Sequence, residues 1–242
     1  MTTGTYRLAR QTARWCRFAA VTVEVEPAAS AEVTVSRTAG GMPTERREAE
    51  LGARTGLHAL GDDGRLRVVV TDIRASAVDT GVGDVHEAAA RAVWRAAGGD
   101  PVRRGYDGFG DPELVAVWLR DRIGLRLDGV TEARHWYEGR RDGDAGSLLY
   151  AWLHFADRPP TRLHGRSEEL LLDVTDPHGP YDMAEHGEVR VGPARRPDLL
   201  ATGVGERLNR AAVLVEPSTG YCSGLLLRLG GIDLLVATLG DE

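Results

Sequence analysis

Residues 68–97 constrain the fold more than any other part of the chain. This stretch opens with the apolar run Val68-Val69-Val70, alternates onward to Ile73 and passes through a short polar bend at residues 74–79. An alanine-rich segment with helical spacing follows, so the stretch predicts a strand, an exposed tip and a helix. The apolar face of that helix consists of Val85, Ala88, Ala89, Ala92, Val93 and Ala96. Because these side chains are mostly small, the helix is expected to lie close against a sheet.

Signals at both ends support this helix. Asp84 precedes Val85, and Glu87 follows three residues later, an arrangement that satisfies the free amide hydrogens of a first helical turn. Gly98-Gly99 is a typical stop signal. The sequence therefore predicts a helix capped by Asp84 that ends before Gly98.

The preceding residues predict the rest of a small domain. Valines at positions 21, 23 and 25 alternate with polar residues, which indicates a half-buried strand over residues 18–27. A second strand is expected over residues 32–36, and a charged helix begins near Thr44. Together with residues 68–97 these elements give a β-β-α-β-α unit, a compact α+β domain.

Several motifs in this unit occur in a characteristic order. They are Arg10-Gln11-Thr12, the strand Val21-Thr22-Val23-Glu24-Val25-Glu26-Pro27, the turn Gly40-Gly41-Met42-Pro43, a helix with Ala49 and Gly56, and Val78-Asp79-Thr80. In this order and spacing, about residues 6–98 resemble domain IV of the translational GTPases, the elongation factor G family with its related ribosomal protection proteins. The resemblance implies the βαβ fold that this domain shares with a small-subunit ribosomal protein, and tip loops that reach the decoding centre.

The resemblance and the basic residues near the tip define candidate contacts to RNA. These are Arg10, Arg14, Arg17, Arg37, Gly40, Gly41, Arg74, Ser76 and Asp79. Two departures affect the tip: Ala75-Ser76-Ala77 stands where the family often carries a polar residue, an aromatic residue or a histidine, and residues 80–83 form a longer link than usual. Arg7, Arg10, Arg14 and Arg17 would line one face of a helix, whereas the resemblance implies an extended strand in this region.

Composition limits what the chain can do. Every basic residue is arginine, which is typical of a high-GC genome of actinobacterial type, and the net charge of -6 gives no overall attraction to nucleic acid. RNA binding would therefore depend on a local arginine patch. The chain has no lysine and hence no G-x-x-x-x-G-K-[ST] loop, so a nucleotide-hydrolysing domain of the GTPase type is excluded. No apolar run reaches membrane length, no cofactor motif occurs, and a cytoplasmic location is expected.

The second half reads as a separate domain. Residues 99–111 are rich in glycine and predict a linker between a domain at 1–98 and another at 112–242. A helix capped by Asp111 with Pro112 in its first position follows. Strands are expected at residues 148–155, 169–174, 187–191, 211–215, 224–229 and 232–239, with a helix at residues 197–210. The class is α+β with a mainly antiparallel sheet, and it resembles no family that we recognise.

One segment of this half raises a metal-binding alternative. His178, Asp182 and His186 recur at four-residue steps and would align on one helix face as ligands. Proline and glycine residues interrupt the segment, however, so an ordered loop is the favoured interpretation.

Two functional hypotheses follow from the sequence. The first is a non-catalytic protein that binds the ribosome or another structured RNA through its first half, while the second half binds a protein partner or regulates the first. The second is an accessory protein that keeps the fold, binds other proteins and does not bind the ribosome. An enzyme ranks third, because no nucleophile motif is present.

Overall fold

The computed structural model describes residues 1–12, 15–61 and 65–238. The chain is α+β with mostly antiparallel sheets, and it divides into two compact units, Met1–Phe109 (unit 1) and Gly110–Glu242 (unit 2). The division falls within the segment predicted as a linker. Among the described residues, no helix has the length and apolar character needed to cross a membrane.

Unit 1 is built on a four-stranded sheet in the order β1-β2-β4-β3. Its strands are β1 (Thr2–Gln11), β2 (Cys16–Pro27), β3 (Glu32–Val35) and β4 (Leu66–Ala75). The β1–β2 and β2–β4 pairs are antiparallel, whereas β3 and β4 run parallel because a helix connects them.

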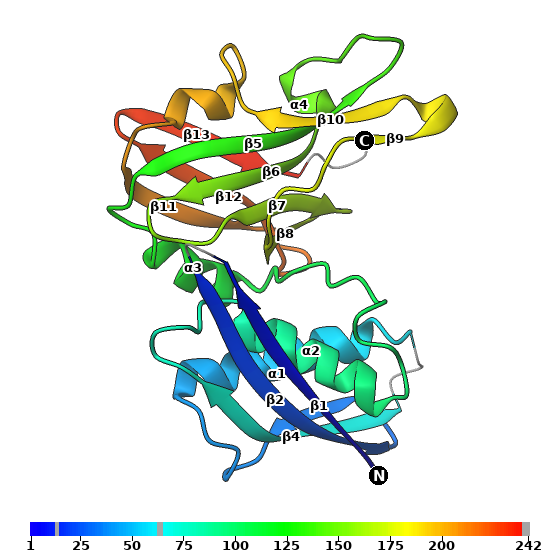
Figure 1. Cartoon of the computed structure of the whole chain (residues 1–242). Coiled ribbons are helices and arrows are strands. Elements are labelled where there is room, and N and C mark those ends of the chain that lie inside the picture. The colour runs from blue at the N-terminus through cyan, green and yellow to red at the C-terminus, as the bar shows by residue number, and fades with distance from the viewer. Residues whose placement is uncertain (13–14, 62–64, 239–242) are drawn as a thin grey trace. The chain divides into compact units, whose positions relative to one another are not determined.

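Two helices, α1 (Pro43–His58) and α2 (Asp84–Ala96), cover one face of this sheet (Figure 1). The buried valines of β2 and β4 pack in the same core as the alanines of α2. The helices also approach each other closely, because a Cβ atom added at Gly52 would lie 2.2 Å from the carbonyl oxygen of His86. Small residues therefore set the distance between the layers, as the alanine-rich pattern predicts.

Residues 2–11 form a strand, the alternative that the resemblance implies, so Arg7 and Arg10 do not line a helix face. One detail of α2 corrects the sequence predictions. The N-cap of α2 is Gly83, whose φ of 98° lies in the left-handed region, and Asp84 is the first helical residue instead of the cap. The Asp84 carboxylate accepts a hydrogen bond from the Gly81 amide instead of capping the helix.

Unit 2 contains helix α3 (Pro112–Arg120) and two antiparallel sheets. The Asp111 side chain accepts hydrogen bonds from the amides of Glu113 and Leu114, so the predicted cap is confirmed. The larger sheet has the order β8-β7-β6-β5-β10-β9, and the smaller sheet has the order β11-β12-β13. The strands are β5 (Leu127–Trp136), β6 (Leu148–Phe155), β7 (Thr161–Arg166), β8 (Glu169–Val174), β9 (Tyr181–Asp182), β10 (Glu188–Pro193), β11 (Leu208–Val215), β12 (Cys222–Leu229) and β13 (Ile232–Ala237).

Short helices fill some of the connections. They are α4 (Asp144–Ser147), η1 (Ala184–His186) and η2 (Leu199–Gly203). The predicted helix at residues 197–210 is wrong, since only η2 forms there and β11 begins at Leu208. Gly203 packs so closely that an added Cβ would lie 2.6 Å from Leu229 Cδ1, and Gly205 has a φ of 91°, so the chain turns where a helix would continue. Leu239, the end of the last predicted strand, lies outside the described residues.

Candidate functional site

Three connections that contain some of the candidate RNA contacts meet at one end of the unit 1 sheet, which we call the loop end. They are the connection between β1 and β2, the β3–α1 loop at residues 36–42 and the β4–α2 loop at residues 76–83. The Phe18 amide donates a hydrogen bond to the Asp79 carbonyl at 2.9 Å, and the Ile73 amide donates to the Ala39 carbonyl at 2.7 Å. Arg14, one of the candidate contacts, lies outside the described residues.

The β3–α1 loop depends on its two glycines. Gly40 and Gly41 both have φ of 76°, a conformation that favours glycine, and a Cβ atom at Gly40 would lie 3.3 Å from the Ile73 carbonyl oxygen. The Arg46 guanidinium on α1 donates to the Gly40 carbonyl at 3.1 Å. Arg37 is exposed, and no described residue is its polar partner. The loop thus holds one available guanidinium on a fixed backbone.

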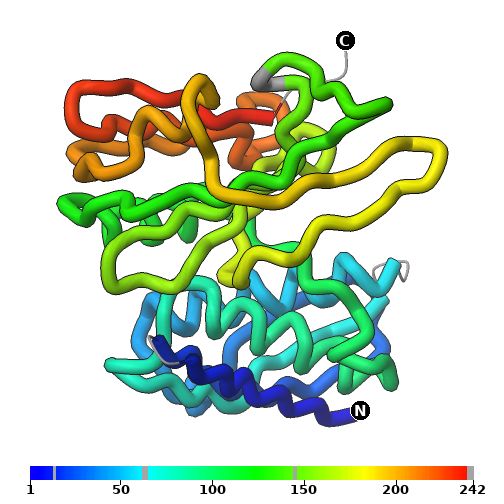
Figure 2. The backbone as a smooth tube through the Cα atoms, turned by 45° about the horizontal axis from the view of Figure 1, so that its top comes forward, coloured from blue at the N-terminus to red at the C-terminus, as the bar shows by residue number. Residues whose placement is uncertain are grey.

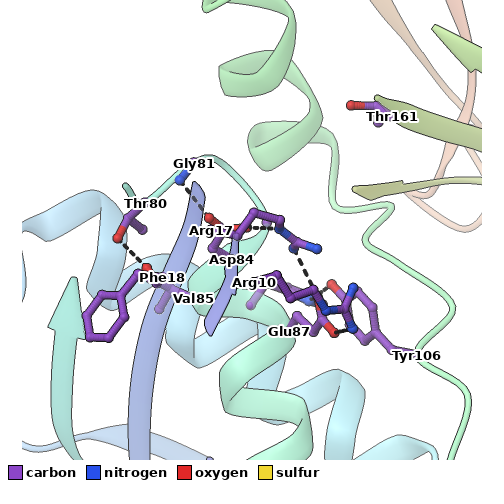
Figure 3. A network of polar contacts seen from close by, with 12 residues as sticks. Arg10, Arg17, Phe18, Thr80, Gly81, Asp84, Val85, Glu87, Tyr106 and Thr161 are labelled. Carbon is purple, nitrogen blue, oxygen red and sulfur yellow. Dashed lines mark hydrogen bonds and ion pairs between the residues drawn. The ribbon is translucent and has the colours of Figure 1, made fainter. Parts of the chain in front are cut away.

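The β4–α2 loop uses its polar side chains for its own turn. Ser76 Oγ donates to Asp79 Oδ2 at 3.2 Å and accepts from the Val78 amide at 3.3 Å. The Thr80 hydroxyl donates to the Phe18 carbonyl and joins the loop to β2 (Figure 3). As a result, the predicted contacts Ser76 and Asp79 are largely engaged, and Val78 is the side chain at the tip, with 91% of its surface exposed.

Arg10 and Arg17 face each other across β1 and β2, on the side of the sheet that the helices cover. Arg17 is 1% exposed and is paired with two carboxylates: Nε lies 2.6 Å from Asp84 Oδ1, and a terminal nitrogen lies 2.9 Å from Glu87 Oε2 (Figure 3). Arg10 reaches Glu87 Oε1 at 3.3 Å, and Arg91 donates to the same oxygen at 2.8 Å. Glu87 therefore bridges three guanidinium groups, and its negative charge offsets the repulsion between them.

This network changes the role of Arg17. A guanidinium that is buried and held by two carboxylates does not contact RNA, so the expectation for Arg17 is corrected to a structural role. Asp84 extends the network to the loop end, because its second oxygen accepts from the Gly81 amide at 2.8 Å. Arg17 therefore positions the β4–α2 loop instead of a ligand.

A second buried group holds the start of α2. Oε1 of Glu48, on α1, accepts hydrogen bonds from the amides of Gly83, Val85 and His86 at 2.8, 3.0 and 3.1 Å. Burial raises the pKa of Glu48 to about 8, although these amide bonds act in the opposite direction. The sequence contains one signal for this role: Glu48 shares the helical face of Ala49 and Gly52, where a packed residue is expected.

His86 is the other buried titratable group at this helix start. Its Nδ1 lies 2.6 Å from the Tyr106 hydroxyl, and its Nε2 lies 3.3 Å from the Thr55 hydroxyl. Burial lowers the pKa of His86 to about 3, so the ring is neutral at physiological pH. Because Glu48 and His86 are both fully enclosed by side chains and backbone, they maintain the fold and do not meet a substrate.

The face of the sheet opposite the helices presents a different set of side chains, which we call the open sheet face. The strand register places Arg7, Ala20 and Arg74 in one row across β1, β2 and β4. The Arg7 guanidinium lies 5.4 Å from the centroid of the partly exposed Phe18 ring. The Arg74 side chain is 74% exposed and contacts Asp72 at 2.9 Å. Sequence reasoning missed Phe18, although strand alternation places it beside Arg7 on the polar face.

Unit 2 does not bring the alternative metal ligands together. His178 packs against aromatic rings, with its centroid 5.0 Å from that of Trp152. Asp182 Oδ1 accepts from the Ala184 amide at 2.9 Å, and His186 is exposed in η1. Among the described residues, no group of three or more His, Cys, Asp or Glu side chains is arranged to hold a metal ion.

Comparisons with known proteins give little further information. No family model and no curated protein matches the chain. A crystal structure described as ttk003000868 from Thermus thermophilus matches with 14% identity and a TM-score of 0.36. The match covers 83% of this chain but only 29% of that one, so this chain spans less than a third of the neighbour's length. A likeness at this level carries no argument about function.

Proposed function

We propose that unit 1 is a non-catalytic module that binds the ribosome or another structured RNA through its loop end and the adjoining open sheet face. The observation that carries this proposal is the row of Arg7 and Arg74 beside the Phe18 ring, at the same end of the sheet as the exposed Arg37. The proposal includes no GTPase activity, since the chain lacks the phosphate-binding loop.

These side chains suit the chemistry of RNA. Guanidinium groups neutralise phosphates and release counterions, and an aromatic ring accepts an unstacked base. The open sheet face offers both within one strand register, whereas the net charge of -6 gives no overall attraction to nucleic acid. The proposal therefore requires local contacts and a binding constant that falls with salt.

The sequence resemblance to domain IV of elongation factor G also supports the proposal. The Gly40-Gly41 turn and the Val78-Asp79 loop lie at one end of a two-layer unit, which is where that resemblance would place RNA-contacting tips. The proposal extends the RNA-contacting surface from these tips to the open sheet face, which the sequence motifs do not include.

The test is co-sedimentation of the purified full chain with assembled ribosomes across a salt series. The Arg7→Glu/Arg74→Glu double variant should lower the affinity by about tenfold or more. Because two phosphate contacts are lost, the slope of log K against log salt should become shallower by about two. The Arg37→Glu/Arg103→Glu double variant makes the same change in net charge but keeps the open sheet face. Its loss of ribosome affinity should therefore be smaller than that of the Arg7→Glu/Arg74→Glu variant.

Arg103→Glu alone is the matched surface control, because Arg103 follows the far end of α2 and its side chain is 89% exposed. It should bind within twofold of the unaltered protein. Absence of ribosome binding at low salt, or an equal loss for Arg103→Glu and Arg74→Glu single variants, would refute the proposal.

One observation favours the alternative of a protein-binding accessory module. Val78 stands 91% exposed at the tip of the β4–α2 loop, where an apolar side chain suits a protein surface better than RNA. On this alternative, Val78→Asp would abolish capture of a protein partner, and the arginine variants would have little effect. Salt-dependent ribosome binding that Val78→Asp leaves unchanged would exclude it.

A further inference from the structure

The open sheet face of unit 1 changes in character along its strands. The helices α1 and α2 lie on the other side of the sheet (Figure 2). Nearest the loop end, Phe18 of β2 lies opposite Ala9 of β1, and two residues further along, Ala20 lies between Arg7 and Arg74. Successive rows of side chains on one face of a strand are about 6.6 Å apart, so these five residues occupy a small area. We call this area the Phe18 platform.

The Phe18 platform has a low centre with longer side chains on both sides. Ala9 and Ala20 end at Cβ, whereas the exposed Arg7 and Arg74 flank Ala20. Because neighbouring strands are about 4.8 Å apart, the backbones that carry these two arginines are separated by about 9.6 Å. Phe18 is partly exposed. A planar group can therefore approach the ring with a guanidinium on either side.

Both guanidinium groups are available to an anion. Arg7 lies 5.4 Å from the centroid of the Phe18 ring, and it pairs with no carboxylate among the residues that the structure describes. Arg74 contacts Asp72 at 2.9 Å, and these two side chains are 74% and 44% exposed. An ion pair this exposed contributes little to stability, so Arg74 can exchange Asp72 for a phosphate.

The far end of the same face limits the area that RNA can occupy. Glu24 lies on the same face as Ala20 and four residues away, which is about 13 Å along β2. Glu26 and Glu32 both contact Arg67, at 3.4 and 3.6 Å. Three carboxylates therefore face one guanidinium here, and this end repels phosphates. The area that attracts RNA extends over about two rows of side chains.

From these observations, and resting on the function proposed above, we infer that the Phe18 platform recognises an unpaired nucleotide of RNA and not a double helix. One base stacks on the Phe18 ring, and Arg7 and Arg74 contact the phosphates on either side of it. In a double helix each base is already stacked on its neighbours, and recognition by shape requires contacts over about 16 base pairs. Two rows of side chains do not provide such contacts, whereas one exposed ring suits one unstacked base.

The test is fluorescence anisotropy of the full chain at low salt with a labelled dodecamer RNA of mixed sequence. The RNA is used as a single strand and as the duplex with its complement. The single strand should bind about tenfold more tightly, although the duplex carries more phosphates and attraction by charge alone would favour it.

Three variants examine the stacking contact. Phe18→Leu keeps an apolar side chain without an aromatic face, so it should weaken single-strand binding by about tenfold and change duplex binding by less than about twofold. Phe18→Tyr keeps the ring and should bind within about twofold of the unaltered chain. Val69→Leu is the matched control, because Val69 lies opposite Glu24, toward the acidic end of the sheet, and should also stay within about twofold. Far-UV circular dichroism checks that each variant is folded.

Two results would overturn the inference: equal affinity for the single strand and the duplex, or equal losses for Phe18→Leu and Val69→Leu. If ribosome binding nevertheless fell with salt and with the Arg7→Glu/Arg74→Glu variant, the proposed function would stand without the stacking contact. Single-strand binding that depends on Phe18, without ribosome binding, would support the inference and refute the ribosome as partner. Absence of binding to ribosomes and to both RNAs would overturn both.

Discussion

The buried Glu48 gives unit 1 a stability that depends on pH in a predictable direction. Its pKa is about 8 in the folded protein against an ordinary value of 4.5, so between these values the folded chain holds a proton that the unfolded chain releases. Stability is therefore highest below pH 4.5 for this group and falls as the pH rises toward 8. One pKa unit corresponds to about 1.4 kcal/mol, so a rise of about 1.5 pH units from pH 6.5 corresponds to a loss of about 2 kcal/mol.

His86 acts in the opposite direction over a different range. Its folded pKa of about 3 lies below the ordinary value of 6.5, so stability is present above pH 6.5 and is lost as the pH falls toward 3. Between pH 4.5 and pH 6.5 the effects of Glu48 and His86 on the pH dependence of stability cancel. Above pH 6.5 the effect of Glu48 acts without that of His86. Burial also raises the pKa of Asp84, which adds a loss of the same sign as that of Glu48.

The Glu48→Gln variant separates these contributions. Glutamine keeps an oxygen for the three amide hydrogen bonds and does not titrate, whereas Asp84 and His86 are unchanged. The free energy of unfolding of the variant minus that of the unaltered protein should rise by about 2 kcal/mol between pH 6.5 and pH 8.

Urea unfolding followed by circular dichroism at pH 5.0, 6.5 and 8.0 measures this difference. Glu50→Gln, on the more exposed side of the same helix, shows the effect of losing one carboxylate. A difference that stays constant or falls between pH 6.5 and pH 8 would refute the reasoning. It would mean that the amide bonds and the helix N-terminus keep Glu48 ionised in spite of its burial.

Three further predictions concern stability. Arg17→Met leaves Asp84 without its buried ion-pair partner and removes one of the three guanidinium partners of Glu87, so it should lower the free energy of unfolding by about 3–5 kcal/mol, measured by urea unfolding at pH 7 with Arg103→Met as control. Gly52→Ala places a Cβ atom 2.2 Å from the His86 carbonyl oxygen and should cost about 1–3 kcal/mol in the same assay; an unchanged midpoint would show that the helices separate freely. Glu138 and Gly139 both have positive φ in a two-residue turn that favours asparagine-glycine, so Glu138→Asn should raise the thermal midpoint; a lower midpoint would contradict this.

Local patterns predicted the elements whose signals lie within a few residues of one another. Residues 68–97 carry strand alternation, a bend and helical spacing in sequence, and β4 and α2 form there. The Asp111-Pro112 pair predicted the start of α3 for the same reason. These signals lie within the segment itself, whereas the first turn of α2 also depends on Glu48 of α1, which the local pattern does not contain.

Strands β5 and β7 were missed because charged residues occupy buried positions in β5 and a partly buried position in β7. In β5, Glu132 and Arg134 are 4% and 5% exposed and pair with each other at 2.7 Å, so the strand lacks the apolar alternation of a typical core strand. In β7, Arg162 pairs at 3.1 Å with Asp173 of the neighbouring strand. Burial of such residues depends on a partner, and in β7 that partner is known only once the strands are paired.

The same limitation explains the arginines of the candidate site. Arg7 and Arg10 are three residues apart in β1, so strand alternation places them on opposite faces of the sheet. The register then puts Arg10 opposite Arg17 on the helix side, where Glu87 of α2 meets both, and puts Arg7 level with Arg74 on the open side. Under the proposed function, the strand arginines that can meet RNA are those on the open side, away from Glu87. The strand register of unit 1, more than the number of arginines near the tip, therefore determines which strand arginines the proposal includes.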